Sequence, residues 1–171
     1  MSLVPVQTLS NLDRVTFVAM LEGVFEHSPW VAERAWVQRP FADLPALEIA
    51  LINSMLAASA DEQLRLIRAH PELAGKAAVA GELTAESSRE QAGARLDACS
   101  PAEFARLQEL NAAYVARFGF PFILAVRGFD RAAIIECFAA RLSNTPAQEF
   151  AEALRQIARI ASLRLRERFP G

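Results

Sequence analysis

The sequence has few of the residues that build disulfide, metal and cofactor sites. Its 171 residues include only two cysteines, Cys99 and Cys137, which form neither a CxxC nor a Cys/His zinc pattern. Two separated cysteines in a domain of this size suit a reducing compartment, where disulfides are rare. The chain also lacks the GxxxxGK[ST], GxGxxG, GxSxG, HExxH and EF-hand loop motifs. No recognisable motif for a nucleotide, zinc or calcium site is therefore present, and we expect no metal ligands.

Strong net charge and long apolar runs are also missing. The formal net charge is −2, which argues against nucleic acid as a partner. No apolar stretch approaches the about 18 residues that a membrane span requires. The start, MSLVPVQTLSNLDRV, lacks the pattern of a signal peptide, and the end, RERFPG, carries no peroxisomal tripeptide. We therefore expect a cytoplasmic protein with no membrane partner.

The chain contains enough apolar material for a folded core. Hydrophobic residues make up 53% of the sequence and charged residues 22%. This balance excludes a disordered chain, because burial of the apolar surface offsets the loss of chain entropy. The length fits one core, so we expect a single domain over residues 1–171.

Helix start signals recur along the whole chain. They stand at Ser10, Ser28-Pro29, Pro45, Ser59 with Glu62, Thr84, Ser100-Pro101 with Glu103, Asp130, and Thr145-Pro146 with Gln148. Apolar residues follow helical spacing almost throughout, whereas FGFPFILAV (118–126) is rich in aromatic and branched residues and contains Pro121. The prediction is an all-α fold, a compact single-domain bundle of about seven to nine helices with one buried extended connector.

His70 is the first candidate for chemistry. It stands directly before Pro71, and proline disfavours the α conformation in the residue that precedes it. This places His70 at a corner between a helix and a loop, where its side chain could point into a cleft. Histidine titrates near neutral pH, as an acid–base group requires. A surface or capping histidine is the alternative interpretation.

Three polar residues form a second candidate group. Ser87, Glu90 and Gln91 are spaced i, i+3 and i+4, so one helix face presents a hydroxyl, a carboxyl and an amide. The structural alternative is also strong, because Ser87-x-x-Glu90 is itself a capping-box pattern and polar helix faces are commonly solvated.

Arg164 is the third candidate. It follows Ile157, Ile160 and Ala161 in the phase of an apolar stripe. An arginine there either extends its charge to water or meets an anion in a cleft. The neighbouring arginines are interspersed with Glu149, Glu152 and Glu167, which suggests a mixed, solvated face rather than a basic patch.

Five segments in order resemble the OHCU decarboxylase family, where OHCU is 2-oxo-4-hydroxy-4-carboxy-5-ureidoimidazoline. They are FEHSPWVAERAW (25–36) with RPF (39–41), IRAHPELAG (67–75), LTAESSREQAGA (83–94), FARLQELNAAYVARFGFPFILAVRG (104–128) and RLSNTPAQEFAEALRQIARIASLRL (141–165). The resemblance implies an all-helical, cofactor-free lyase that decarboxylates OHCU to (S)-allantoin in urate degradation. It also implies a homodimer, with urate oxidase and 5-hydroxyisourate hydrolase as pathway neighbours. It does not imply physical association with either enzyme.

The resemblance also assigns roles to residues of this chain. It implies His70, Glu90 and Arg164 as catalytic residues. The substrate-binding residues that it implies are Pro71, Ser87, Gln91, Phe122, Ile123, Leu124, Ala125 and Val126. The last five would offer main-chain groups of the connector to the heterocycle. A non-catalytic helical interaction module is the alternative function, and it would leave Arg164 on the apolar stripe without a purpose.

Overall fold

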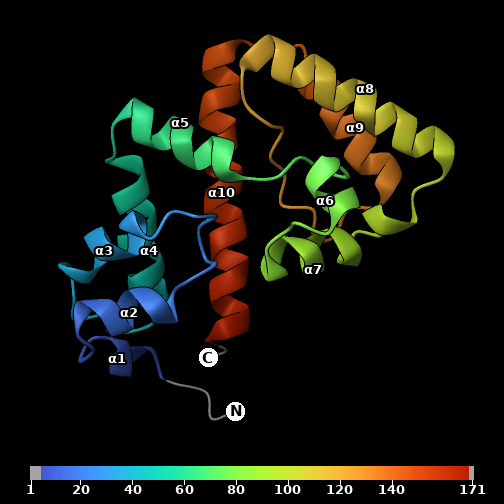
Figure 1. Ribbon diagram of the computed structural model, residues 1–171. Coiled ribbons are helices and arrows are strands. Elements are labelled where there is room, and N and C mark those ends of the chain that lie inside the picture. Colours follow the sequence, from blue (N-terminus) through green and yellow to red (C-terminus); the bar gives the residue numbers. More distant parts are fainter. Residues whose placement is uncertain (1–4, 170–171) are drawn as a thin grey trace. The chain divides into compact units, whose positions relative to one another are not determined.

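All regular elements of the protein are helices in the computed structural model, which describes residues 5–169 apart from the side chain of residue 77 (Figure 1). They are α1 (Val6–Leu9), α2 (Arg14–Met20), α3 (Trp30–Trp36), α4 (Leu44–Leu56), α5 (Ala60–Ala69), α6 (Lys76–Ala80), α7 (Ala85–Gly93), the 3₁₀ helix η1 (Leu96–Ala98), α8 (Pro101–Phe118), α9 (Arg131–Arg141) and α10 (Pro146–Arg168). Over the described range there is no strand. The all-α prediction is confirmed.

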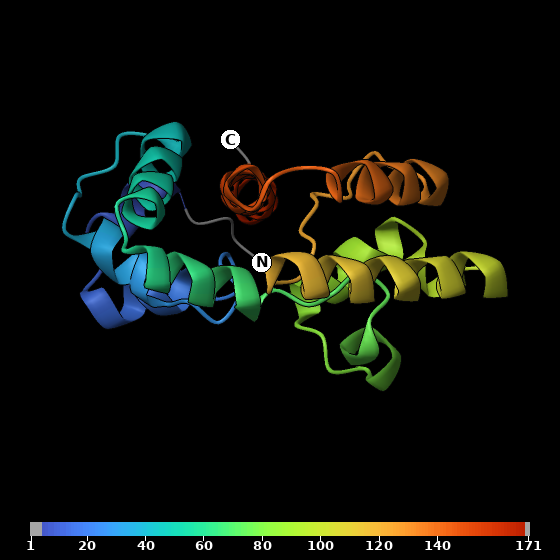
Figure 2. The same ribbon diagram turned by 90° about the horizontal axis from the view of Figure 1, so that it is seen from above.

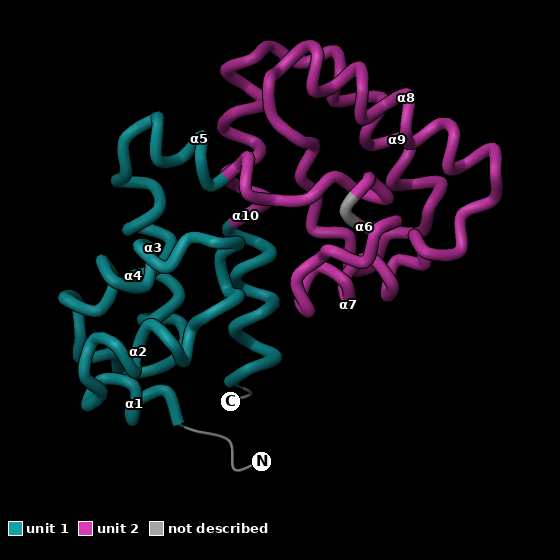
Figure 3. Tube along the Cα trace, in the orientation of Figure 1, with its two compact units in different colours: residues 1–66, 158–171 teal, residues 67–157 magenta. Residues whose placement is uncertain are grey.

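The chain divides into two compact units, drawn in different colours in Figure 3. Unit 1 consists of residues 1–66 and 158–171, and unit 2 consists of residues 67–157. Helices α1 to α4 belong to unit 1, and α6 to α9 with η1 belong to unit 2. Helices α5 and α10 contribute residues to both. Of the described helices, none is both long and apolar enough to cross a membrane.

Unit 1 is built on the packing of α2 against α3 and of α3 against α4. Asp13 begins α2 by accepting a hydrogen bond from the Thr16 N–H at 3.0 Å. The prediction that Ser10 caps this helix is therefore wrong. The Ser10 hydroxyl instead accepts from the Phe41 N–H at 2.7 Å, a contact across 31 residues that no local pattern contains.

The helix starts in unit 2 follow the predicted signals closely. Thr84 caps α7, Asp130 caps α9, and Ser100 forms a reciprocal capping box with Glu103 at the start of α8. Gly119 ends α8 in the left-handed conformation, with φ of 76°, which glycine adopts without steric cost. Helices α8 and α9 lie side by side in the views of Figures 1 and 2. Short-range side-chain bonds thus define where these helices begin, and a backbone conformation that suits glycine defines where α8 ends.

The segment after α8 is buried although it has no regular secondary structure. The Phe122 ring stacks on Phe138 of α9 with a centroid distance of 3.9 Å. Tyr114 of α8 meets Phe122 edge-on at 5.5 Å and Phe138 at 5.7 Å. The predicted buried connector is therefore confirmed, and its aromatic residues form a core that joins it to α8 and α9.

Candidate functional site

His70 lies at the predicted corner. Helix α5 ends at Ala69, and the His70 N–H still donates to the Ile67 carbonyl at 3.2 Å before the chain turns at Pro71. The residue is only 7% exposed. The alternative interpretation as a surface histidine is therefore wrong. A buried imidazole has fewer waters to exchange protons with, so its position relative to a bound substrate decides what it can do.

Gln91 of α7 holds the loop that follows His70. Its Oε1 accepts from the Ala74 N–H at 2.9 Å, and its Nε2 donates to the Glu72 carbonyl at 3.3 Å. Ala74 has a positive φ of 49°, which is uncommon for a residue with a side chain. Both amide atoms of Gln91 are thus engaged in fixing a loop of unusual backbone geometry.

Two amides of α8 hold the same loop. Asn111 Nδ2 donates to the Leu73 carbonyl at 2.9 Å, and Gln108 Nε2 donates to the Ala74 carbonyl at 2.8 Å. Asn111 is 3% exposed and Gln108 is half-buried. A loop has no regular pattern of main-chain hydrogen bonds, so side chains supply partners for its buried main-chain groups. The loop after His70 is therefore fixed from two helices.

The polar face of α7 points inward. Ser87 and Gln91 are buried, and Glu90 is half-buried. The helix begins at Thr84, whose hydroxyl accepts from the Ser87 N–H at 3.3 Å, so Ser87 is inside the helix and the capping-box interpretation of Ser87-x-x-Glu90 is wrong. The hydroxyl, carboxyl and amide that the spacing predicts on one face all come from residues at least partly withdrawn from water.

The connector residues Phe122 to Val126 are each at most 6% exposed. Two main-chain groups have side-chain partners. The Ile123 carbonyl accepts from Arg141 Nη1 at 2.7 Å, and the Ala125 N–H donates to Gln156 Oε1 at 3.0 Å. Neither Arg141 nor Gln156 is among the predicted site residues. Their bonds give the connector a defined backbone course without a sheet or a helix.

Arg141 belongs to a buried polar network. Its guanidinium pairs with the Glu149 carboxylate at 2.8 Å, and Tyr114 and Asn144 also donate to that carboxylate. Burial alone would raise the pKa of Glu149, but these hydrogen bonds, first among them that of Arg141, outweigh it and hold the pKa below its ordinary value. Glu149 has no exposed surface, so its interpretation as part of a solvated face is wrong.

The hydrogen bonds around Glu149 predict that the free energy of unfolding depends on pH. Because the folded pKa of Glu149 is depressed, its contribution is complete above the unfolded pKa and is lost as the pH falls through the folded value. We expect the free energy of unfolding of wild type to exceed that of Glu149→Gln most at neutral pH, by about 3–5 kcal/mol. Urea denaturation across the acid range should show this difference shrinking toward low pH. A constant difference would contradict the argument.

Arg164 lies on the part of α10 that belongs to unit 1, whereas the other predicted site residues belong to unit 2. It is 4% exposed, so its extension to water is excluded. Nη2 pairs with Glu26 Oε1 at 3.0 Å, and Nη1 donates to the Gly23 carbonyl at 2.9 Å. Glu26, itself 1% exposed, was not predicted. The anion that Arg164 meets in this structure is a carboxylate of the protein.

The two cysteines are free thiols. Burial raises the pKa of Cys99 and of Cys137 above the ordinary thiol value. Both therefore stay protonated at neutral pH, which is the unreactive form. Within the part of the chain that the structure describes, no group of three or more His, Cys, Asp or Glu side chains is arranged to hold a metal ion.

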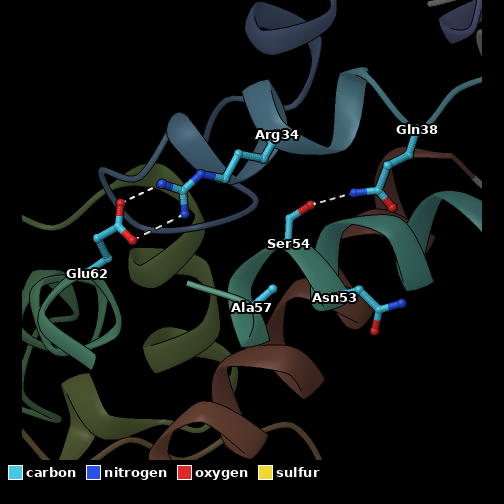
Figure 4. A pocket seen from close by; sticks show the side chains of 6 residues that line it. All are labelled: Arg34, Gln38, Asn53, Ser54, Ala57 and Glu62. Atoms are coloured by element: carbon cyan, nitrogen blue, oxygen red, sulfur yellow. Dashed lines mark hydrogen bonds and ion pairs between the residues drawn. The ribbon is translucent and has the colours of Figure 1, made fainter. Parts of the chain in front are cut away.

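A shallow polar pocket of about 440 Å³ lies in unit 1 (Figure 4). Arg34 and Glu62 form a two-point ion pair across it, and Gln38 donates to Ser54 at 2.9 Å. The Arg34 guanidinium, helped by Ser59, lowers the pKa of Glu62 to about 2. The two charges cancel each other, and no predicted site residue lines the pocket.

A family model, a relative and a solved structure that are similar to this chain carry related names. The family model described as OHCU decarboxylase matches residues 10–166. The chain is 40% identical over 167 residues to the 2-oxo-4-hydroxy-4-carboxy-5-ureidoimidazoline decarboxylase of Halalkalicoccus jeotgali, covering 98% of this chain and 93% of that one. A crystal structure of (S)-allantoin synthase superposes with a TM-score of 0.75 at 30% identity, over 97% of this chain and 54% of that chain.

A second solved structure agrees in fold. A crystal structure of OHCU decarboxylase in the presence of (S)-allantoin gives a TM-score of 0.69 at 21% identity, over 86% of this chain and 96% of that chain. At this identity the likeness concerns the helical fold alone. The sequence relationships carry the family membership, and this comparison adds that the arrangement of the backbone agrees.

Proposed function

Because the chain belongs to the OHCU decarboxylase family, we propose that it is a carboxy-lyase that converts OHCU to (S)-allantoin and carbon dioxide in urate degradation. The observation that carries the proposal is the buried His70, placed at a helix corner whose following loop is fixed by Gln91 and two amides of α8. This arrangement fixes the backbone that follows a buried acid–base group, and His70 stands in one of the segments that resemble the family.

The substrate supplies its own electron sink. Its carboxylate is attached to a carbon next to a ring C=N bond. When carbon dioxide leaves, the electron pair of the broken C–C bond enters that C=N system, and the ring nitrogen takes up a proton to give an enol-like intermediate. Protonation of the neighbouring carbon and loss of the hydroxyl proton then give allantoin. The reaction therefore asks the protein for proton transfer and orientation.

We assign the proton transfer to His70. Its imidazole can exchange a proton with the reacting carbon or its hydroxyl, a contribution of about 10²–10⁴-fold. Glu90, which is only half-buried, would hydrogen-bond the ring or ureido N–H groups and set the protonation state of the imidazole. Protonation from one face sets the stereocentre, so a fixed imidazole explains why the product would be (S)-allantoin.

The remaining contacts orient the ring. Ser87, Gln91 and Pro71 would contact the substrate from α7 and the corner loop, and main-chain groups of residues 122–126 would meet the heterocycle. All of these residues belong to unit 2. Fixed groups of this kind raise the rate by presenting the substrate in one reactive geometry, at no cost of reorganisation during the reaction.

Arg164 is proposed as the third catalytic residue. A guanidinium that merely stabilised the departing carboxylate would lower the ground state and would not speed its loss. We therefore assign Arg164 to orientation of the substrate or to stabilisation of charge developing on the ring. The family resemblance supports this role, and the ion pair with Glu26 would position the guanidinium for it.

We further propose that the protein works as a cytoplasmic homodimer. Urate oxidase and 5-hydroxyisourate hydrolase would supply its substrate. These proposals follow the family resemblance, and none of them enters the chemistry above.

Circular dichroism of freshly generated OHCU tests the proposed activity. OHCU made in place from urate by urate oxidase and 5-hydroxyisourate hydrolase should give a rapid (S)-allantoin signal when this protein is added. The slow decay of OHCU without the protein gives racemic allantoin, which has no circular dichroism signal. A chelator should leave the rate unchanged. Unaltered decay to racemic allantoin in the presence of folded protein would reject the activity and favour the interaction-module alternative.

A further inference from the structure

The connector poses a hydrogen-bonding problem. Residues 122–126 are buried, yet they belong to no helix or strand that would pair their N–H and carbonyl groups. Buried main-chain groups nearly always find partners. The Val126 carbonyl accepts from the Phe129 N–H at 3.0 Å, and side chains supply partners for other groups of the segment. Two such side chains are observed, Arg141 on the Ile123 carbonyl and Gln156 on the Ala125 N–H. They contact alternate residues of the same short segment.

Arg141 is itself held rigidly. Glu149 binds its Nε and Nη2, leaving Nη1 to donate to the connector. The guanidinium carbon also lies 4.4 Å from the centroid of the Phe122 ring. An arginine fixed by a bidentate carboxylate and by an aromatic face presents its remaining N–H in one direction. Arg141 therefore fixes the position of the Ile123 carbonyl in addition to packing in the core.

Gln156 is held by one hydrogen bond within α10. Its Nε2 donates to Glu152 Oε1 at 2.7 Å, one turn earlier on α10, and this bond orients its Oε1 toward the Ala125 N–H. The bond between Gln156 and the Ala125 N–H also limits which main-chain groups of the connector a ligand could use. The Ala125 N–H is occupied by the protein, so it is not the group that a ligand would use without displacing Gln156.

We propose that Arg141 and Gln156 are positioning residues for the decarboxylation. They act by fixing the connector, and we call these two side chains the clamp. The inference rests on the proposed function, since it concerns the main-chain groups that would meet the heterocycle. The clamp sets the spacing of these groups and touches no reacting atom. Its loss would misplace the substrate, which would raise KM, lower kcat, or both, in enzyme that is still folded.

The chain offers matched controls for both members. Arg131 also lies on α9, also pairs with a glutamate, Glu103, and also donates to a main-chain carbonyl, that of Arg95 at 3.4 Å. Gln148 lies on the same helix as Gln156, and its amide oxygen caps the start of α10. Neither is hydrogen-bonded to residues 122–126, so their replacement removes an interaction of the same kind without releasing the connector, in the case of Arg131 at a more exposed position.

The experiment measures kcat and KM for OHCU, per folded molecule, in Arg141→Gln, Gln156→Ala, Arg131→Gln and Gln148→Ala. The clamp variants should lose about tenfold to 100-fold in kcat/KM, since a small misplacement of bound groups has effects of that size. Arg141→Lys should recover part of the loss. The two controls should stay within about twofold of wild type. Gln156→Ala removes the bond from the Ala125 N–H and the bond to Glu152 without removing a charged group. It keeps the test valid even if Arg141→Gln does not fold.

The outcomes separate the inference from the proposed function. If wild type decarboxylates OHCU and both clamp variants keep wild-type kinetics per folded molecule, the clamp is overturned while the function stands. If the controls lose as much activity as the clamp variants, the effect is general destabilisation and the clamp is again rejected. If wild type itself does not act on OHCU, the proposed function fails and the inference falls with it.

Discussion

Replacement of His70 by alanine should abolish decarboxylation. The imidazole is the group to which we assign proton transfer, and its loss should lower the rate by about 10²–10⁴-fold, to near the spontaneous decay of OHCU. Because the loop after His70 is held independently by Gln91 and α8, the backbone should keep its course. Stopped-flow circular dichroism of OHCU decay gives the rate, and thermal denaturation gives the stability.

The other histidine of the chain provides the control. His27 is exposed and has a positive φ of 44°, a conformation that asparagine tolerates. His27→Asn should therefore leave both stability and activity unchanged, whereas His70→Asn should be inactive, because asparagine keeps hydrogen bonding but cannot titrate. Near-wild-type turnover by either His70 variant would reject the mechanism even if the substrate were correct.

Arg164→Ala should lose both activity and stability. The substitution removes the guanidinium that pairs with the buried Glu26 carboxylate, and breaking a buried ion pair from one side costs about 3–5 kcal/mol. If Arg164 also orients the substrate, kcat/KM per folded molecule should fall as well. Urea denaturation and OHCU kinetics measured on the same preparation separate the two effects.

A double variant distinguishes the two roles of Arg164. Arg164→Ala combined with Glu26→Ala removes both charges, so much of the stability should return. If Arg164 contacts the substrate, activity should remain low in the restored protein. Recovery of activity together with stability would instead assign Arg164 a purely structural role and remove it from the site.

Sequence reasoning predicted the features that depend on neighbouring residues. The capping signals at Thr84, Ser100 and Asp130 mark helix starts, because each side chain bonds a backbone N–H three residues away. The capping prediction was wrong at Ser10, because the Ser10 hydroxyl accepts a hydrogen bond from the distant Phe41 N–H. The short helices α1 and α6 carry no strong signal, and the division into two units follows from long-range contacts that composition does not reveal.

The candidate site shows the same limit. The corner at His70 and the inward face of α7 follow from local rules, namely the residue before proline and the i, i+3, i+4 spacing. The partner of Arg164 could not be predicted, because Glu26 is 138 residues away. Glu149 could have been found, since it stands four residues before the buried Ala153 and in phase with Ile157. A charged residue in phase with an apolar stripe indicates a buried, paired charge, as at Arg164.

The aromatic residues give each unit its own optical reporter. Both tryptophans, Trp30 and Trp36, lie on α3 in unit 1, and the only tyrosine of the chain, Tyr114, is buried in unit 2. Burial, reinforced by the bond to Glu149, raises the pKa of Tyr114, so its phenol stays neutral in alkaline solution while unit 2 is folded. Tryptophan fluorescence therefore follows the melting of unit 1, and the appearance of tyrosinate absorbance follows that of unit 2. An unlabelled sample thus reveals whether the two halves unfold together or in sequence.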